Sequence, residues 1–173
     1  MTMVVVAVLA SLTVSLGSMI TDNRRTGAVS DVLSGIAFAR SQAMSRGVTV
    51  TMCRSSDQVT CSTGTGWESG WIVFIDASNA GVIDTGETIL FVHGALNSNQ
   101  TIRGNAGVAN RITFNPFGVA SGTSGTLLVC DSRGVSKARA VVLGVGGGAL
   151  SYDPATVIAP ATTPLASSCP TPT

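Results

Sequence analysis

The feature that most constrains this chain is an apolar segment at its beginning. Residues 1–20 contain no charged side chain, and Val4–Ala10 consists only of valine, alanine and leucine. A helix needs about 20 consecutive, mostly apolar residues to cross the roughly 30 Å hydrocarbon core of a bilayer. The sequence therefore predicts that the first 20 residues form a transmembrane helix.

The helical pattern continues beyond the charged residues that follow this segment. Apolar side chains recur at spacings of three and four as far as about Ser45, which is the pattern of a helix with one buried stripe. Arg46 followed by Gly47 is typical of a helix end. We therefore predict one helix over residues 1–46, whose first half lies in lipid or against identical neighbours and whose second half packs on a soluble domain. The stripe comprises Val29, Val32, Leu33, Ile36, Ala39, Ala43 and Met44.

The chain after Gly47 has the pattern of short strands and turns. Alternating β-branched residues in Val48–Cys53 and the apolar run Trp71–Ile75 predict two strands, the second of which is covered on both faces. Short strands separated by turn residues favour antiparallel sheets stacked as a sandwich or a partly closed barrel. The fold class is therefore α+β, with one globular domain over residues 47–152. Further strands are predicted at Thr88–Val92, Thr101–Arg103, Arg111–Phe114, Thr126–Cys130, Ala138–Leu143 and Ala149–Tyr152.

The cysteines and the last segment of the chain predict disulfides and a tethered tail. Residues 153–173 are rich in proline, threonine, alanine and serine, which excludes a helix or a central strand. Four cysteines without a Cys-x-x-Cys pair, and a single histidine, favour disulfides over zinc and place the domain outside the cytosol. Of the three pairings we favour Cys53 with Cys61, which closes a short polar loop, and Cys130 with Cys169, which tethers the tail.

The charge of the chain bears on nucleic-acid binding. A net charge of +1, with only 11% of residues charged, provides no overall attraction to nucleic acid. Local DNA binding stays open as an alternative, because basic residues near strand ends could line one stripe. It is not favoured, since no basic residue follows Arg139. The candidates are Arg103, Arg111, Arg133, Lys137 and Arg139.

Two further patterns have only a loose similarity to enzyme motifs. The cluster Gly144–Gly148 is glycine-rich like a dinucleotide-binding loop, but a strand-like segment and prolines follow it where a helix is needed, so we predict a hairpin turn. The one histidine, His93, has neither a Gly-x-Ser-x-Gly nucleophile nor a marked acidic partner in the sequence. We therefore predict no catalytic residue and no cofactor.

Residues 76–87 have oxygen-bearing side chains in the register of a calcium loop. A glycine stands at position six, but Ala80 occupies position five and strands replace the flanking helices. The favoured interpretation is a turn linking two strands, and a weak calcium site is the alternative. The candidate ligands, at positions one, three, nine and twelve, are Asp76, Ser78, Asp84 and Glu87.

Taken together, these segments resemble a type IV pilin-like subunit of the GspH/FimT family of minor pseudopilins and minor pilins. The order and spacing of several blocks carry the resemblance, which runs from about residue 4 to residue 143. The blocks are Val5–Leu12, Ala39–Ala43 with Arg46–Gly47, Val50–Cys53, Gly70–Asp76, Asp84, Gly86–Glu87, Ile89–Leu90, Phe114–Gly118, Cys130–Gly134 and Ala138–Arg139.

The resemblance implies one long N-terminal helix packed on two antiparallel sheets, a pilin-like β-sandwich. It implies a non-enzymatic subunit at or near the tip of a type IV pilus, or of the pseudopilus by which type II secretion moves folded proteins through the outer membrane. The implied location is the bacterial inner membrane, crossed once, with the domain in the periplasm. The implied partners are other pilins and the assembly machinery, with no small-molecule substrate. The helix residues expected in membrane or filament are Val4, Val5, Val6, Val8, Leu9, Leu12 and Leu16.

Two departures from the family pattern bear on this interpretation. Family members begin with a basic leader, a glycine before the cleavage site and an acidic residue in the mature helix, and we expect these upstream of Met1. We therefore assign no cleavage or methylation residue. Such a leader also resolves the position of Arg24 and Arg25, which by the positive-inside rule would otherwise leave the domain in the cytoplasm. DNA-binding members carry arginines near the final cysteine, where this tail is uncharged, so DNA uptake is the alternative function.

Overall fold

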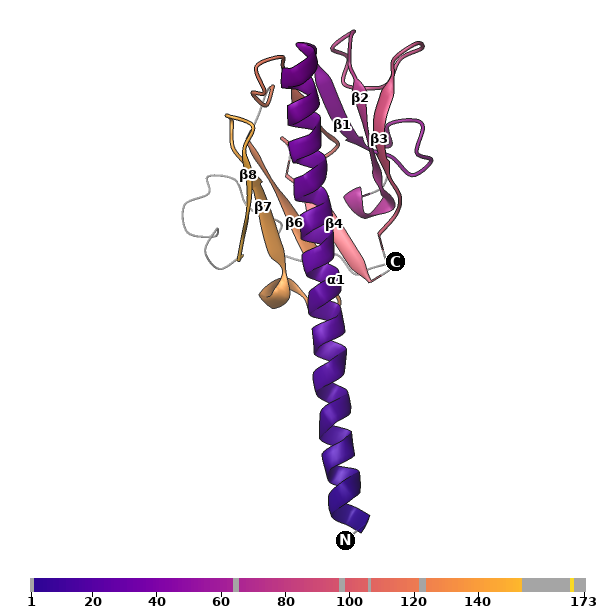
Figure 1. The fold of residues 1–173 in the computed structure, drawn as a ribbon, viewed down its shortest axis with the longest axis vertical. Helices are drawn as coiled ribbons and strands as arrows, with labels where there is room; N and C mark the ends of the chain where they lie inside the picture. The colour runs from indigo at the N-terminus through magenta and orange to yellow at the C-terminus, as the bar shows by residue number, and fades with distance from the viewer. Residues whose placement is uncertain are drawn as a thin grey trace.

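The computed structural model consists of one long helix laid across two four-stranded sheets (Figure 1). It describes residues 2–63, 66–96, 99–105, 107–121, 124–153 and 169. Of residues 2–16 it describes only the backbone, and side chains are described from Gly17 onward. Helix α1 spans Thr2–Arg46, and its N-terminal half extends beyond the sheets (Figure 1). The unbroken helix through the charged residues, predicted from the apolar periodicity, is confirmed.

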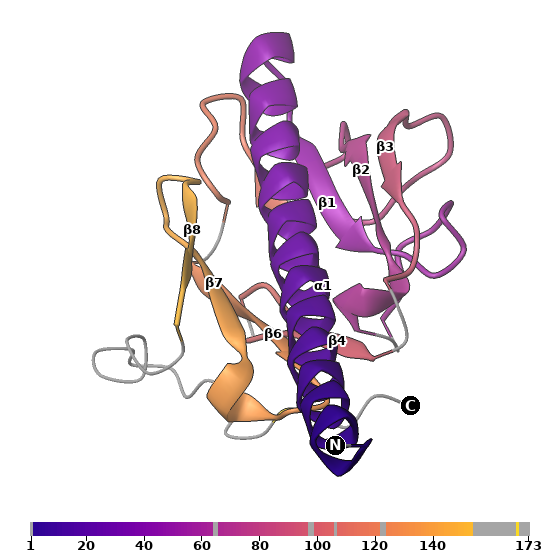
Figure 2. The same ribbon diagram turned by 60° about the horizontal axis from the view of Figure 1, so that its bottom comes forward.

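All neighbouring strands in the two sheets are antiparallel, and α1 lies across both sheets (Figure 2). This confirms the predicted fold class, and the predicted strands differ from the observed ones by only one or two residues at their ends. The first sheet has the order β3-β2-β1-β5, formed by β1 (Val50–Arg54), β2 (Trp71–Ile75), β3 (Ile89–His93) and β5 (Arg111–Phe114). The second has the order β4-β6-β7-β8, formed by β4 (Gln100–Gly104), β6 (Gly125–Asp131), β7 (Arg139–Leu143) and β8 (Ala149–Tyr152).

One hydrophobic core joins the helix to both sheets. Its helical side is the predicted stripe, in which Val32, Ile36, Ala39 and Ala43 are buried. Met44 is placed on this stripe by its spacing, and that prediction is wrong, because its side chain is 47% exposed. Met44 lies in the last turn, close to Gly118 of the loop that follows β5. The sheets contribute Val50, Met52, Val73, Ile112 and Phe114 from the first and Ile102, Leu127, Val129, Val141 and Leu143 from the second.

A glycine allows the helix to lie close to the first sheet. A Cβ atom on Gly35 would stand 2.9 Å from Nε1 of Trp71 and 3.1 Å from Cε of Met52. Because real Cβ atoms require more room than this, a larger residue at position 35 would require Trp71, Met52 or the helix itself to shift. The helix then ends at Gly47, which has φ of +66° and donates its amide to the carbonyl of Ala43 at 3.0 Å.

Both predicted disulfides are present. Cys53 at the end of β1 is bonded to Cys61, and Cys130 of β6 is bonded to Cys169 of the tail. Their sequence separations of 8 and 39 residues correspond, in the chain-entropy account, to about 2.5 and about 4 kcal/mol of stabilisation. The rest of the predicted tail, residues 154–168 and 170–173, lies outside the described residues.

The predicted membrane segment falls largely on side chains that the structure does not describe. Within the described part of the chain, no helical stretch is both long enough and apolar enough to cross a bilayer. The residues predicted for membrane or filament, Val4, Val5, Val6, Val8, Leu9, Leu12 and Leu16, lie outside the described side chains.

The packing of α1 predicts that its buried face dominates the stability of the domain. Replacing Ile36 by alanine leaves a cavity between helix and sheets, and we expect it to lower the free energy of unfolding by about 2–5 kcal/mol. The matched control Ser34→Ala lies on the exposed face of the same helix, and its effect should stay within about 0.5 kcal/mol. Urea unfolding of the full chain in detergent, followed by the fluorescence of buried Trp67 and Trp71, measures both. Equal effects of the two substitutions would contradict the packing.

Candidate functional site

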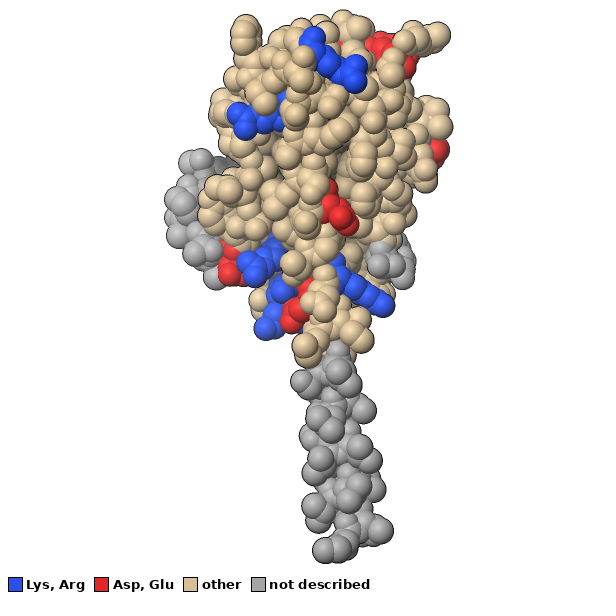
Figure 3. Space-filling model, in the orientation of Figure 1, with Lys and Arg blue, Asp and Glu red and all other residues tan. Residues whose placement is uncertain are grey.

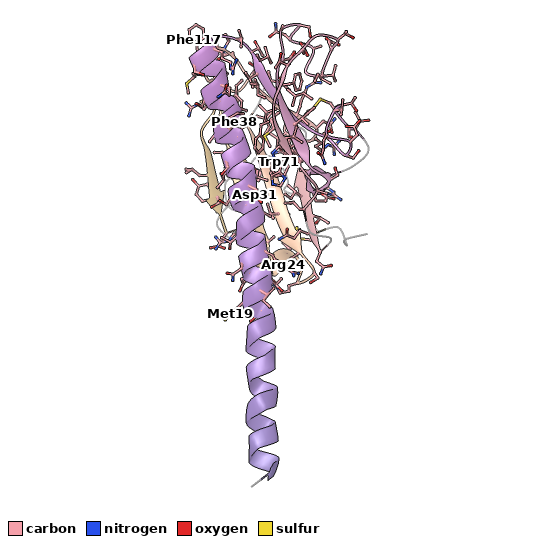
Figure 4. The ribbon with its side chains drawn as sticks, turned by 45° about the vertical axis from the view of Figure 1, so that its right-hand side comes forward. Met19, Arg24, Asp31, Phe38, Trp71 and Phe117 are labelled. Atoms are coloured by element: carbon pink, nitrogen blue, oxygen red, sulfur yellow. A yellow bond between two sulfur atoms is a disulfide. The ribbon has the colours of Figure 1, made fainter. Side chains whose placement is uncertain are left out.

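Ionised side chains gather on both sides of α1 where the helix leaves the domain (Figure 3). We call this group the basal cluster. Its members come from the helix, from the end of β6 and the turn after it, from the short 3-10 helix η2 (Val135–Lys137), from β7, and from the residue after β8. Figure 4 shows Arg24 near this end of the domain and Phe117 at the opposite end. The cluster comprises Asp22, Arg24, Arg25, Asp131, Arg133, Lys137, Arg139 and Asp153.

Arg133 is the centre of the basal cluster. Its Nη2 lies 2.8 Å from Oδ1 of Asp22 and 2.7 Å from Oδ2 of Asp131, and its Nε donates to Oδ1 of Asp131 at 3.1 Å. Arg25 completes the contact from the helix, because it pairs with Asp22 at 3.0 Å and donates to the main-chain carbonyl of Lys137. Two arginines and two aspartates therefore fasten α1 to the turn that follows β6.

The electrostatics of the cluster favour the charged forms of Asp22, Asp131 and Arg133. Hydrogen bonding from Arg133 is the main reason that the pKa of Asp22 lies below its usual 3.8. Burial alone would raise the pKa of Asp131, but the hydrogen bonds from the side chain and backbone of Arg133 outweigh it and lower that pKa. The same two carboxylates raise the pKa of Arg133. These three side chains are therefore ionised at neutral pH.

The structure brings three of the five DNA-binding candidates together in the basal cluster. Arg133 is neutralised by two aspartates, and Arg139 pairs with Asp153 at 3.1 Å. Lys137 is exposed. The remaining two candidates have partners of their own, since Arg103 pairs with Glu68 and Arg111 donates to the carbonyl of Gly81 at 3.3 Å. The predicted basic stripe is thus divided and largely charge-compensated.

The calcium candidates brace the connection between β2 and β3. Buried Asp76 accepts hydrogen bonds from the hydroxyl of Thr51 at 2.7 Å and from the amide of Gly81 at 3.0 Å. Ser78 donates to Asp84 at 2.8 Å, while Glu87 accepts from the amide of Asp84 at 3.0 Å. Among the described residues, no three acidic, histidine or cysteine side chains are grouped so as to hold a metal ion. The favoured interpretation, a turn linking two strands, is confirmed, and calcium binding stays a prediction.

His93 has an acidic partner that the sequence analysis missed. Its Nε2 lies 3.6 Å from Oδ2 of Asp31 on α1, and its Nδ1 lies 2.7 Å from the carbonyl of Gly94. The ring also stacks on Trp71, with centroids 4.0 Å apart and planes 6° from parallel. The contact with Asp31 joins β3 to the helix, and the stacking on Trp71 joins it to β2. Asp31 and His93 belong to elements far apart in the chain, so no local pattern links them.

The glycine cluster forms the predicted hairpin between β7 and β8. The amide of Gly144 donates to the carbonyl of Gly148, and the amide of Gly147 donates to that of Gly144, each at 2.9 Å. Apolar side chains near this hairpin are exposed, most of all Phe117 at 82%. The sequence analysis did not identify this exposed apolar surface. A phenylalanine in a loop has no local sequence feature that tells whether its side chain is buried or exposed. A shallow hollow on this hairpin is lined by Val142, Gly144, Gly148, Ala149, Leu150 and Tyr152.

The comparison with protein families decides the assignment. The family described as Type II transport protein GspH matches residues 28–147. This chain belongs to the GspH family. The matched range begins within α1, at the point where the helix packs on the domain, and ends in the hairpin between β7 and β8. The GspH family comprises minor pilins and pseudopilins of type IV pili and type II secretion systems, which are structural subunits.

Solved structures similar to this GspH-family chain include the type IV minor pilin FimU of Pseudomonas aeruginosa in two crystal forms. The first is 19% identical, with a TM-score of 0.59 over 75% of this chain and 89% of FimU. The second is 18% identical, with a TM-score of 0.57 over 73% of this chain and 91% of FimU. No curated protein matches the chain. The structural likeness confirms the pilin-like fold predicted from the sequence.

The basal cluster predicts a loss of stability in acid. Asp131 has a lowered pKa, so its contribution is present above about pH 4 and is lost as the pH falls through its folded-state value. We expect Asp131→Asn to lower the free energy of unfolding by about 2 kcal/mol at neutral pH, because it weakens hydrogen bonds to charged Arg133. The difference from the unmodified chain should shrink in acid, as both then lack the carboxylate.

Urea unfolding as a function of pH measures this difference. Asp153→Asn is the matched control, because Asp153 is an exposed carboxylate that pairs with Arg139 at the same end of the domain. Its effect should be small at every pH. A gap between Asp131→Asn and the unmodified chain that stays constant from neutral to strongly acidic pH would show that the ionised network does not stabilise the fold.

Proposed function

We propose that this GspH-family chain is a non-enzymatic minor pseudopilin or minor pilin, placed at or near the tip of its filament and supporting protein secretion. The observation that carries the proposal is the division of α1. Its C-terminal half forms the helical side of the domain core, whereas its N-terminal half extends past the sheets (Figure 1). An apolar helix without a partner in its own domain needs lipid or neighbouring helices to cover it.

The exposed face of the C-terminal half of α1 supports close packing between subunits. Small residues recur there at spacings of three and four, so they lie along one side of the helix. Small side chains permit two helix backbones to approach closely. A neighbouring helix could therefore continue along α1 from its apolar half to the domain. The exposed small residues are Gly27, Ser30, Ser34, Ala37 and Ser41.

The location that we propose is the bacterial inner membrane, crossed once by the N-terminal helix, with the domain in the periplasm. The apolar sequence of residues 1–20 supports the anchor. The two disulfides support an oxidising compartment for the domain. Partners in this proposal are other pilins or pseudopilins and the machinery that assembles them. DNA uptake has less support, because Arg133 and Arg139 are both paired with aspartates.

Deleting the gene in its native host tests the role directly. The proposal expects a large decrease in cargo secreted by the type II system, restored when the unmodified chain is supplied in trans. Normal secretion together with lost surface pili would assign the chain to a pilus instead. Normal secretion and pili with lost transformation would favour the DNA-uptake alternative and contradict the proposal.

The helix sequence predicts that one charge in the apolar half prevents assembly without unfolding the domain. We expect Val8→Lys to abolish incorporation into filaments and to reduce secretion to the level of the deletion, because a charged side chain in a membrane helix costs about 2.5–3.5 kcal/mol. Val8→Leu is the matched control and should restore secretion. Protease resistance of the domain checks that it is folded. Full secretion with Val8→Lys would be incompatible with a buried apolar half.

A further inference from the structure

Two cations of the basal cluster have no counter-ion in the described part of the chain. Arg24 and Lys137 are exposed, and among the described residues no carboxylate lies within ion-pair distance of either one. The aspartates of the cluster are bonded to the arginines at positions 25, 133 and 139. The residues outside the description contain no aspartate or glutamate that could serve instead. The base of the domain therefore carries positive charge that the acidic side chains of the chain do not neutralise.

Exposed apolar side chains precede the unpaired cation Arg24 on α1. Met19 and Ile20 are 59% and 52% exposed, and they precede Arg24 by about one helical turn. At about 1.5 Å per residue, Arg24 is only about 6 Å along the axis from Ile20. Lys137 of η2 reaches the same level, because its main-chain carbonyl accepts a hydrogen bond from Arg25. Along the axis of α1, exposed apolar side chains are therefore followed by cationic ones, in the same order as the hydrocarbon core and the headgroups of a membrane.

We propose that Arg24 and Lys137 bind the phosphate-bearing headgroups of anionic phospholipids and dock the base of the domain on the membrane surface. The inference rests on the membrane anchor of the proposed function. When the apolar segment lies in the hydrocarbon, both cations stand at headgroup depth, where long basic side chains are stabilised. Docking at a second place, beside the anchor, restricts the tilt of the domain relative to the membrane.

The ion pairs within the basal cluster favour a lipid surface over DNA as the binding partner. A duplex is held by neutralising many phosphates along its backbone, and the described residues of the basal cluster leave only two cations for this. Arg133 and Arg139, which would extend a DNA-binding stripe, are bonded to aspartates. A membrane needs no continuous stripe, because each headgroup diffuses to the cation that binds it.

Energy transfer in vesicles tests the proposal with the full chain. A donor dye on Ser136→Cys, an exposed position beside Lys137, reports the proximity of the base to headgroups that carry an acceptor. The vesicles are phosphatidylcholine alone or mixed with phosphatidylglycerol. On the anionic vesicles, each unpaired cation should raise the ratio of docked to undocked domain about fivefold, and the two cations together should raise it about 30-fold. Added salt should reduce this increase.

Variants identify the residues responsible. Arg24→Gln combined with Lys137→Gln should abolish the difference between the two vesicle types. The matched control, Arg46→Gln combined with Arg111→Gln, removes the same charge away from the basal cluster and should keep the difference. An equal difference in both double variants, or none in the unmodified chain, would overturn the proposal.

Two other outcomes separate this inference from the proposed function. A chain that inserts into both kinds of vesicle without a phosphatidylglycerol effect refutes the headgroup docking alone and leaves the anchor intact. A chain that inserts into neither contradicts the anchor, and with it the docking. Duplex DNA that binds the unmodified chain but not the Arg24→Gln, Lys137→Gln variant, without any lipid effect, would reassign the surface to nucleic acid.

Discussion

Burial of one face of α1 between two antiparallel sheets is the contact on which the rest of this structure depends. Val32 and Ile36 enter a core to which both sheets contribute, so removing the helix would expose the inner faces of both. Gly35 allows the approach, because a larger side chain would meet Trp71 and Met52. The helix is therefore part of the domain and also the rod that extends beyond it.

Polar contacts hold this rod at a defined position on the domain. At the base, Arg25 and Arg133 join the helix to the turn after β6 through Asp22 and Asp131. Nearer the middle, Asp31 lies beside His93 of β3. Each contact joins the helix to a different sheet, so together they oppose rotation of the domain about α1. A rod that transmits force or position in a filament requires such a rigid joint.

Elements with a local pattern were predictable from the sequence, and so was the distant pair Cys130–Cys169, because pairing Cys53 with Cys61 leaves only these two cysteines. Ion pairs between distant residues were not predictable. The helix has its apolar periodicity, the strands their alternation and turn residues, and Cys53 and Cys61 are close in the chain. The pairing of Arg133 with Asp22 and that of His93 with Asp31 depend on how the sheets fold back on the helix. Met44 follows the apolar spacing but lies near the loop at Gly118 and is 47% exposed, so periodicity alone placed it wrongly.

The central claim is that the N-terminal half of α1 becomes buried against the helices of neighbouring subunits. A photoreactive amino acid at Leu9 in living cells, with Ser136 on the domain surface as the control position, tests this most directly. The account predicts that Leu9 cross-links to other pilins or pseudopilins when the assembly machinery is present, and that these products disappear in its absence. Cross-links from Leu9 only to lipid, with the machinery present, would contradict it.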